Sequence, residues 1–141
     1  MKFTTAFITF FAFLPAVLAT PTAPHVARTT PTAISVKNFT RTCAEPSPCV
    51  YKFVIDYQFG TQWCTTTDPA PAAKSHSWYG IFCEENHTWE ISWGWDYQND
   101  FTVMTVVDEP NQYEAFFGYK SPNRATAYPD QGPNTVKLVG T

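Results

Sequence analysis

The chain has 141 residues, of which 17% are aromatic and only 15% are charged, and its formal net charge is −3 at pH 7. This length is typical of one domain, with a small core that disulfide bonds would reinforce. A mildly acidic chain with nine basic residues offers no basic stripe for a phosphate backbone, so composition argues against a nucleic-acid partner.

The first 19 residues have the pattern of a secretory signal peptide. Lys2 precedes an apolar run from Ala6 to Leu18, and small residues follow. The run is shorter than the roughly 20 apolar residues that a membrane-spanning helix needs. We therefore predict cleavage after Ala19, a secreted, extracellular product, no membrane partner, and an oxidising environment for the four cysteines.

Residues 20–33 are rich in Thr, Pro and Ala and are predicted to form a disordered leader. Residues 34–141 are predicted to form a single β domain, because short runs of β-branched and aromatic residues alternate with Pro, Gly, Asn and Asp clusters. The predicted strands are Ile34–Cys43, Cys49–Phe59, Ser77–Cys83, Thr88–Tyr97, Phe101–Val107, Gln112–Tyr119 and Thr135–Val139, with Thr61–Cys64 as an addition to one of them.

Alternation along Cys49–Phe59 and along Thr88–Tyr97 defines the buried face of each of these two predicted strands. One face of the second predicted strand carries the residues Tyr51, Phe53, Ile55, Tyr57 and Phe59. Short turns between strands favour an antiparallel arrangement, whose edges need protection. We expect an all-β fold, a small antiparallel β-barrel or sandwich, with irregular loops at Thr65–His76 and Tyr128–Pro133.

The four cysteines allow three disulfide pairings. Cys43 and Cys49 flank a five-residue loop containing two prolines, between strands expected to be neighbours, so this pair is geometrically easy. Cys64 and Cys83 would then join across the longer loop. No C-x-x-C spacing supports a metal or redox site, so structural disulfides are the favoured interpretation.

Two sequons, Asn38-Phe39-Thr40 and Asn86-His87-Thr88, match the N-glycosylation pattern of secreted proteins. Asn86 is expected in an open turn. Asn38 lies inside a predicted strand, where it could be occluded.

No catalytic motif emerges from the sequence. His76 and His87 flank Cys83 and could approach each other, but their spacing matches no metal-ligand pattern. The chain lacks a G-x-S-x-G nucleophile motif and a glycine-rich phosphate loop. We therefore predict a protein that is not an enzyme and that uses neither a metal nor a cofactor.

The aromatic series Trp89, Trp93, Trp95 and Tyr97 admits two interpretations. A flat platform of rings could stack on sugars or planar phenolic ligands. The stronger interpretation is the core face of a central strand, because Ile91 belongs to the same series. A mixed outcome would bury most of the series and leave Trp95 or Tyr97 for ligand binding.

The pattern resembles a fungal secreted β-barrel family that includes the major Alternaria-type allergen and hypersensitive-response elicitors. The residues that carry the resemblance are Ile34–Arg41, Tyr51–Ile55, Trp63-Cys64, His76–Tyr79 with Cys83, and the strand from Trp89. The spacing of Tyr79 and Cys83 and the position of the Cys43–Cys49 pair place the chain in a sister group. The resemblance implies a β-barrel, release by a fungus and a non-enzymatic role toward a plant host, and some relatives carry a small phenolic ligand.

These observations favour a secreted effector- or elicitor-like protein that binds a host extracellular protein or a small ligand. The alternative is a carbohydrate- or small phenolic-ligand-binding module, with Trp95 and Tyr97 at its site.

Overall fold

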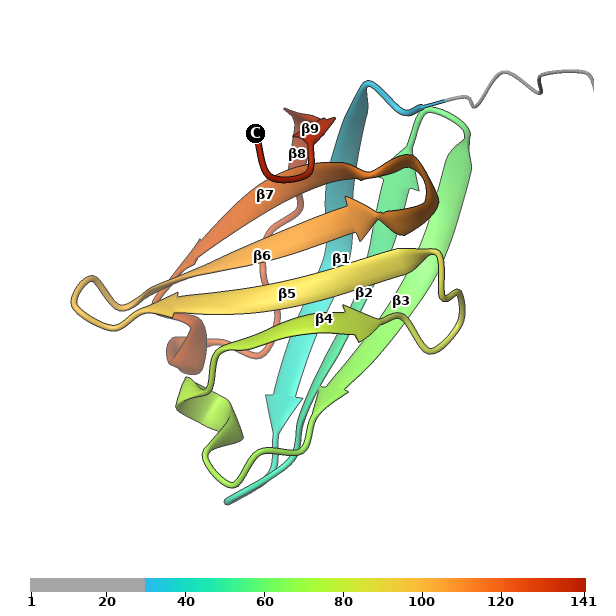
Figure 1. Cartoon of the computed structure of the whole chain (residues 1–141). Coiled ribbons are helices and arrows are strands. Elements are labelled where there is room, and N and C mark those ends of the chain that lie inside the picture. The colour runs from blue at the N-terminus through green and yellow to red at the C-terminus, as the bar shows by residue number, and fades with distance from the viewer. Residues whose placement is uncertain (1–29) are drawn as a thin grey trace, which may run out of the picture.

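A computed structural model describes residues 30–141, so the predicted signal peptide and most of the predicted leader lie outside the described residues. The described chain forms two antiparallel sheets that pack face to face (Figure 1). One sheet has the strand order β3-β2-β1-β8 and the other β4-β5-β6-β7-β9. Of the two expected architectures, the structure is the sandwich, because neither sheet closes on itself.

The strands are β1 (Ala33–Cys43), β2 (Cys49–Tyr57), β3 (Gly60–Asp68), β4 (Trp78–Phe82), β5 (Trp89–Asp96), β6 (Phe101–Asp108), β7 (Tyr113–Lys120), β8 (Gln131–Thr135) and β9 (Lys137–Leu138). Three short 3-10 turns accompany them, η1 (Ala73–Ser75), η2 (Glu109–Asn111) and η3 (Pro122–Arg124). No helix in this part of the chain is long and apolar enough to cross a membrane.

A β-bulge in β1 decides which of its side chains enter the core. Ile34 and Val36 are fully buried, and simple alternation would then send residue 38 inward. Instead the register shifts between Lys37 and Thr40, Asn38 takes a left-handed φ of 52°, and Phe39 becomes the next buried residue. The inserted residue reverses the inward parity, so Arg41 also lies between the sheets.

Aromatic side chains fill the space between the sheets. Phe39 is at the centre, with ring centroids 4.9 Å from Tyr119, 5.9 Å from Trp93 and 5.9 Å from Phe53. Edge-to-face packing of such rings combines a large buried area with favourable quadrupole contacts. The core is therefore thin but dense in aromatic carbon.

Each open side of the sandwich is closed differently. On one side the Cys64–Cys83 disulfide ties β3 to the end of β4. On the other side β8 does not pair with β7 through its backbone, but the side-chain amides of Gln131 and Asn134 donate to the carbonyls of Gly118 and Phe116, both at 2.6 Å. These bonds satisfy acceptors that a free sheet edge would expose.

The second disulfide, Cys43–Cys49, closes the β1–β2 hairpin, where the two residues are register partners. Both predicted pairings are confirmed, Cys43–Cys49 from the hairpin spacing and Cys64–Cys83 as the remaining pair. No free cysteine remains among the described residues.

Three boundaries predicted from sequence were wrong. The expected loop Thr65–His76 begins too early, because β3 continues to Asp68 in full register with β2. The expected loop Tyr128–Pro133 ends too late, because Gln131–Pro133 belong to β8. The single expected strand Thr135–Val139 is replaced by the end of β8 and the short β9, which pair with different sheets.

Candidate functional site

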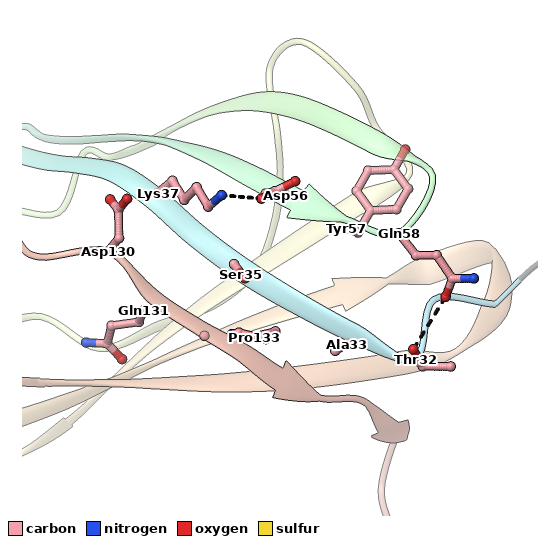
Figure 2. A pocket seen from close by; sticks show the side chains of 11 residues that line it. Thr32, Ala33, Ser35, Lys37, Asp56, Tyr57, Gln58, Asp130, Gln131 and Pro133 are labelled. Atoms are coloured by element: carbon pink, nitrogen blue, oxygen red, sulfur yellow. Dashed lines mark hydrogen bonds and ion pairs between the residues drawn. The ribbon is translucent and has the colours of Figure 1, made fainter.

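An open groove of about 550 Å³ lies on the outer face of the first sheet (Figure 2). It follows β1 between β2 and β8. Ser35 and Lys37 of β1 face it, because their neighbours Ile34 and Val36 face the core. Its wall residues from the other two strands and their flanks include Asp56, Tyr57, Gln58, Asp130, Gln131, Gly132 and Pro133.

Charged side chains gather at one end of this groove. The Lys37 ammonium lies 2.5 Å from a carboxylate oxygen of Asp56, with Asp130 on the opposite wall (Figure 2). The hydrogen bond to Asp56 and its negative charge raise the pKa of Lys37 above its usual value, with a smaller contribution from Asp130. Lys37 is therefore a fixed cation at neutral pH, flanked by two acidic side chains.

Strand β8, which pairs with β1 through an irregular register, forms the far wall of the groove. β8 pairs with β1 at Ile34↔Asn134 and Val36↔Gln131, and its register shifts between these two pairs. Gly132 sits in the shift with φ of +101°, and a Cβ atom there would lie 2.8 Å from the Ile34 carbonyl oxygen. Only glycine fits this close approach without strain. The wall therefore depends on one glycine.

The other end of the groove is uncharged. Thr32 donates a hydrogen bond to the side-chain oxygen of Gln58 at 3.4 Å, and Tyr57 lies beside them (Figure 2). The groove thus offers a gradient from full charges to amide and hydroxyl groups. Such a lining suits an extended polar partner better than a compact apolar molecule.

The predicted ligand-binding residues Trp95 and Tyr97 lie away from this groove, at the end of β5. Trp89 and Trp93 are buried, as the core interpretation of the series predicts. Trp95 is half-buried, whereas Tyr97 is 65% exposed. The Trp95 and Tyr97 rings stack in parallel, with centroids 5.8 Å apart and planes 4° from each other. The structure therefore leaves one exposed ring of the series rather than a platform.

The histidines of the described residues do not form a joint site. His76 contacts the buried carboxylate of Asp68 through Nδ1 at 3.0 Å. His87 instead lies against the ring of Phe82. Within residues 30–141 no group of three or more His, Cys, Asp and Glu side chains is placed to hold a metal ion.

The two sequons differ in their surroundings. Asn38 is exposed on the β1 bulge, at the charged end of the groove, and its backbone N–H donates to Asp130 at 2.8 Å. The expectation that strand structure would occlude Asn38 was wrong, because the bulge turns it outward. Asn86 is half-buried, and its side-chain amide donates to Gln62 at 3.2 Å. Glycosylation at both sites stays a prediction.

Sequence reasoning missed the groove for an identifiable reason. Lys37 and Asp56 were recognisable as outward-facing residues of two predicted strands. Asp130 and Gln131, however, fell in a segment predicted to be a loop, so nothing placed them beside β1. A pairing between β1 and β8, which are far apart in the chain, carries no local sequence signal.

Comparison with known families adds one finding. Residues 35–138 match the family model described as Effector TSP1, and this range spans β1 through β9. No curated protein matches the chain. This match does not confirm the resemblance to the Alternaria-type allergen family. Because the match covers well over half of the sequence, the chain belongs to the Effector TSP1 family.

Proposed function

We propose that this protein is a secreted effector that acts by binding a host extracellular protein through the groove between β2 and β8, without catalysing a reaction. Membership of an effector family supports an effector-like role. The groove is the observation that carries the mode of action. The fungal origin and the plant host come from the resemblance and are part of this proposal.

The lining of the groove supports contact with a polypeptide. Fixed charges at Lys37, Asp56 and Asp130 can steer and orient an oppositely patterned partner. Amide and hydroxyl groups at the other end can bond to backbone groups of an extended segment. The groove is open along its length rather than enclosed, which favours a chain over a small molecule.

The two disulfides support secretion. Disulfide bonds persist in oxidising compartments and are rare in reducing ones, and both pairs of cysteines in the described chain are joined. A small sandwich with a thin core gains most from such links outside the cell. The signal peptide predicted at residues 1–19 is the matching export signal.

The experiment compares the native protein with a groove variant and a matched control. Purified protein is infiltrated into leaves, and in parallel it is immobilised and exposed to leaf apoplastic fluid. Lys37→Glu reverses the groove cation, and Lys120→Glu makes the same change on an exposed β7 residue of the other sheet. We expect a host response and a retained protein with the native and Lys120→Glu chains, and a loss of both with Lys37→Glu.

Thermal unfolding of all three proteins checks that the variants are folded. A host response that survives Lys37→Glu undiminished would refute the groove as the contact surface. No response and no retained protein with the native chain would refute the effector proposal itself.

A second candidate function rests on the exposed ring of Tyr97. The parallel Trp95–Tyr97 pair offers one aromatic face that a sugar or a phenolic ring could cover. Tryptophan fluorescence titrated with chitin oligomers, glucan oligomers or a flavonoid tests this candidate, with Tyr97→Ala as the variant. An unchanged spectrum with all three ligands would eliminate it.

A further inference from the structure

Arg41 is a buried cation without an acidic partner. The β1 bulge directs its side chain between the two sheets, where the residue is only 3% exposed. Among residues 30–141, no carboxylate forms an ion pair with it. An arginine does not lose its proton in a protein, so this charge is permanent. Burial of an uncompensated charge is costly, which makes the surroundings of Arg41 informative.

Neutral dipoles provide the contacts of the Arg41 guanidinium. Nη2 donates to the carbonyl oxygens of Lys74 at 2.8 Å and Ala73 at 3.3 Å. Nη1 donates to the Asn123 side-chain oxygen at 2.8 Å, and Nε has no hydrogen-bond partner. The charge also lies 5.4 Å from the Tyr51 ring centroid and 5.7 Å from that of Trp93. These contacts hold the guanidinium in place but supply no negative charge.

A separate small pocket opens at this position. It has a volume of about 160 Å³ and is lined by Arg41, Lys74 and Asn123, with residues 43, 122, 125 and 126 completing the wall. Its lining contains two cations and no carboxylate. The Lys74 ammonium pairs with the exposed Glu45, outside the pocket lining. Because Glu45 compensates the charge of Lys74, the uncompensated positive charge of this pocket is that of Arg41.

Asn123 makes the pocket a donor site. Its side-chain oxygen accepts from Arg41, and Asn123 is exposed, so its two amide N–H groups are open to solvent and to a ligand. The Arg41 guanidinium also interacts with the hydroxyl groups of Tyr51 and Tyr128, which are neutral and leave its charge uncompensated. Unpaired donors beside a permanent cation are the chemistry of an anion site.

We propose that the pocket over Arg41 binds the carboxylate group of a small organic acid. A carboxylate is planar and presents two oxygens, which suits the paired donors of arginine and an amide. The volume holds roughly five water molecules at ~30 Å³ each, so it fits an acid of a few heavy atoms. The site is at the η1–η3 end of the sandwich, and it is independent of the groove proposed as the effector surface.

The test titrates the folded protein, with its two disulfides intact, with sodium acetate and sodium benzoate, followed by two-dimensional ¹H–¹⁵N NMR at constant ionic strength. The reporters are the Asn123 side-chain amide and the Trp93 indole N–H. Acetamide and benzamide, which have the same shapes without the charge, are the matched ligands. We expect saturable shifts with a Kd of about 1 mM for the acids, and no shifts for the amides, which lack the charge.

Three variants locate the site. Asn123→Asp places an internal carboxylate on the guanidinium, and we expect it to weaken acid binding at least about tenfold, as like charges in one site repel. Lys74→Gln removes the ammonium that compensates Glu45 and leaves that carboxylate unpaired beside the pocket, so we expect acid binding to weaken severalfold. Lys137→Gln, at an exposed residue of β9, is expected to leave acid binding unchanged.

Shifts that rise linearly without saturation, or that the neutral amides reproduce, would overturn the proposal. Undiminished binding to a folded Asn123→Asp protein would also overturn it. Inorganic phosphate provides the last arm, because tighter binding of phosphate than of acetate would contradict the assignment to carboxylates.

Discussion

The Cys64–Cys83 disulfide should contribute more to stability than the Cys43–Cys49 disulfide. The first joins residues 19 positions apart and links the two sheets, whereas the second joins residues 6 positions apart within one hairpin. A link that closes a longer loop removes more conformational entropy from the unfolded chain. The hairpin of β1 and β2 also retains its backbone ladder when its disulfide is removed.

The loop-entropy relation gives the size of the difference. Loops of these lengths correspond to about 3.2 kcal/mol for Cys64–Cys83 and about 2.2 kcal/mol for Cys43–Cys49 at 25 °C. With Cys64 and Cys83 replaced, the β3–β4 side is held by weaker contacts, such as those of Glu85 with the Thr65 backbone N–H at 2.7 Å and hydroxyl at 2.5 Å. We therefore expect a gap of about 1 kcal/mol or more between the two double variants.

The assay is urea unfolding of the native protein, Cys64→Ala/Cys83→Ala and Cys43→Ala/Cys49→Ala, followed by tryptophan fluorescence and by far-ultraviolet circular dichroism. Coincident curves from both probes would justify a two-state fit. The free energy of unfolding should fall in the order native, hairpin variant, cross-sheet variant. A hairpin variant that is less stable than the cross-sheet variant would refute the reasoning.

Three further predictions concern the core, the open edge and alkaline pH. Phe39→Ala should lower the free energy of unfolding by about 3–5 kcal/mol, because the fully buried ring leaves a cavity among other aromatic rings; a loss below 1 kcal/mol in urea unfolding would contradict its central place. Asn134→Ala should lower the free energy of unfolding by about 1 kcal/mol, because the hydrogen bond to the β7 carbonyl is lost. Hydrogen exchange of the β7 amides should become faster in this variant, and unchanged exchange would contradict the role given to this bond. Burial raises the pKa of Tyr51, Tyr119 and Tyr128 above 10.0, so these phenols stay neutral in the folded state while the unfolded chain ionises. Their contribution to stability is complete below pH 10 and is lost as the pH rises through the raised values. Absorbance at 295 nm should therefore show these three ionising together with unfolding, and ionisation of all seven tyrosines near pH 10 in a folded protein would be the contrary result.

The faces of the central strands could be predicted because their residues obey strict alternation. Tyr51, Phe53 and Ile55 lie on the inner face of β2, and Trp89 and Trp93 on that of β5, as two-residue periodicity requires. The Cys43–Cys49 disulfide could also be predicted, from the short spacing of its two cysteines. Cys43 and Cys49 flank a loop too short to leave the two strands apart.

The elements that escaped prediction depend on tertiary contacts. β8 contains Gly132 and Pro133, which are poor strand formers, and it exists because it pairs with β1 and its amides bond to β7. The end of β3 is a run of threonines, whose β-propensity was outweighed in the prediction by the prolines that follow. Propensity alone gave no means of placing either segment.

The bulge at Asn38 had the largest effect on the candidate sites. Strict alternation from Ile34 and Val36 would place Arg41 on the outer face, and only the extra residue brings it inside. Asparagine adopts the left-handed conformation in many turns, so an asparagine within a predicted strand does not by itself predict a bulge. The pocket over Arg41 was therefore beyond sequence reasoning.

Titration calorimetry with the host protein retained by the native chain tests the central claim, action by contact through the groove, most directly. The account predicts saturable binding, a host protein whose mass is unchanged after incubation, and loss of binding with Lys37→Glu but not with Lys120→Glu. A host protein of altered mass, or equal binding by the two variants, would contradict it.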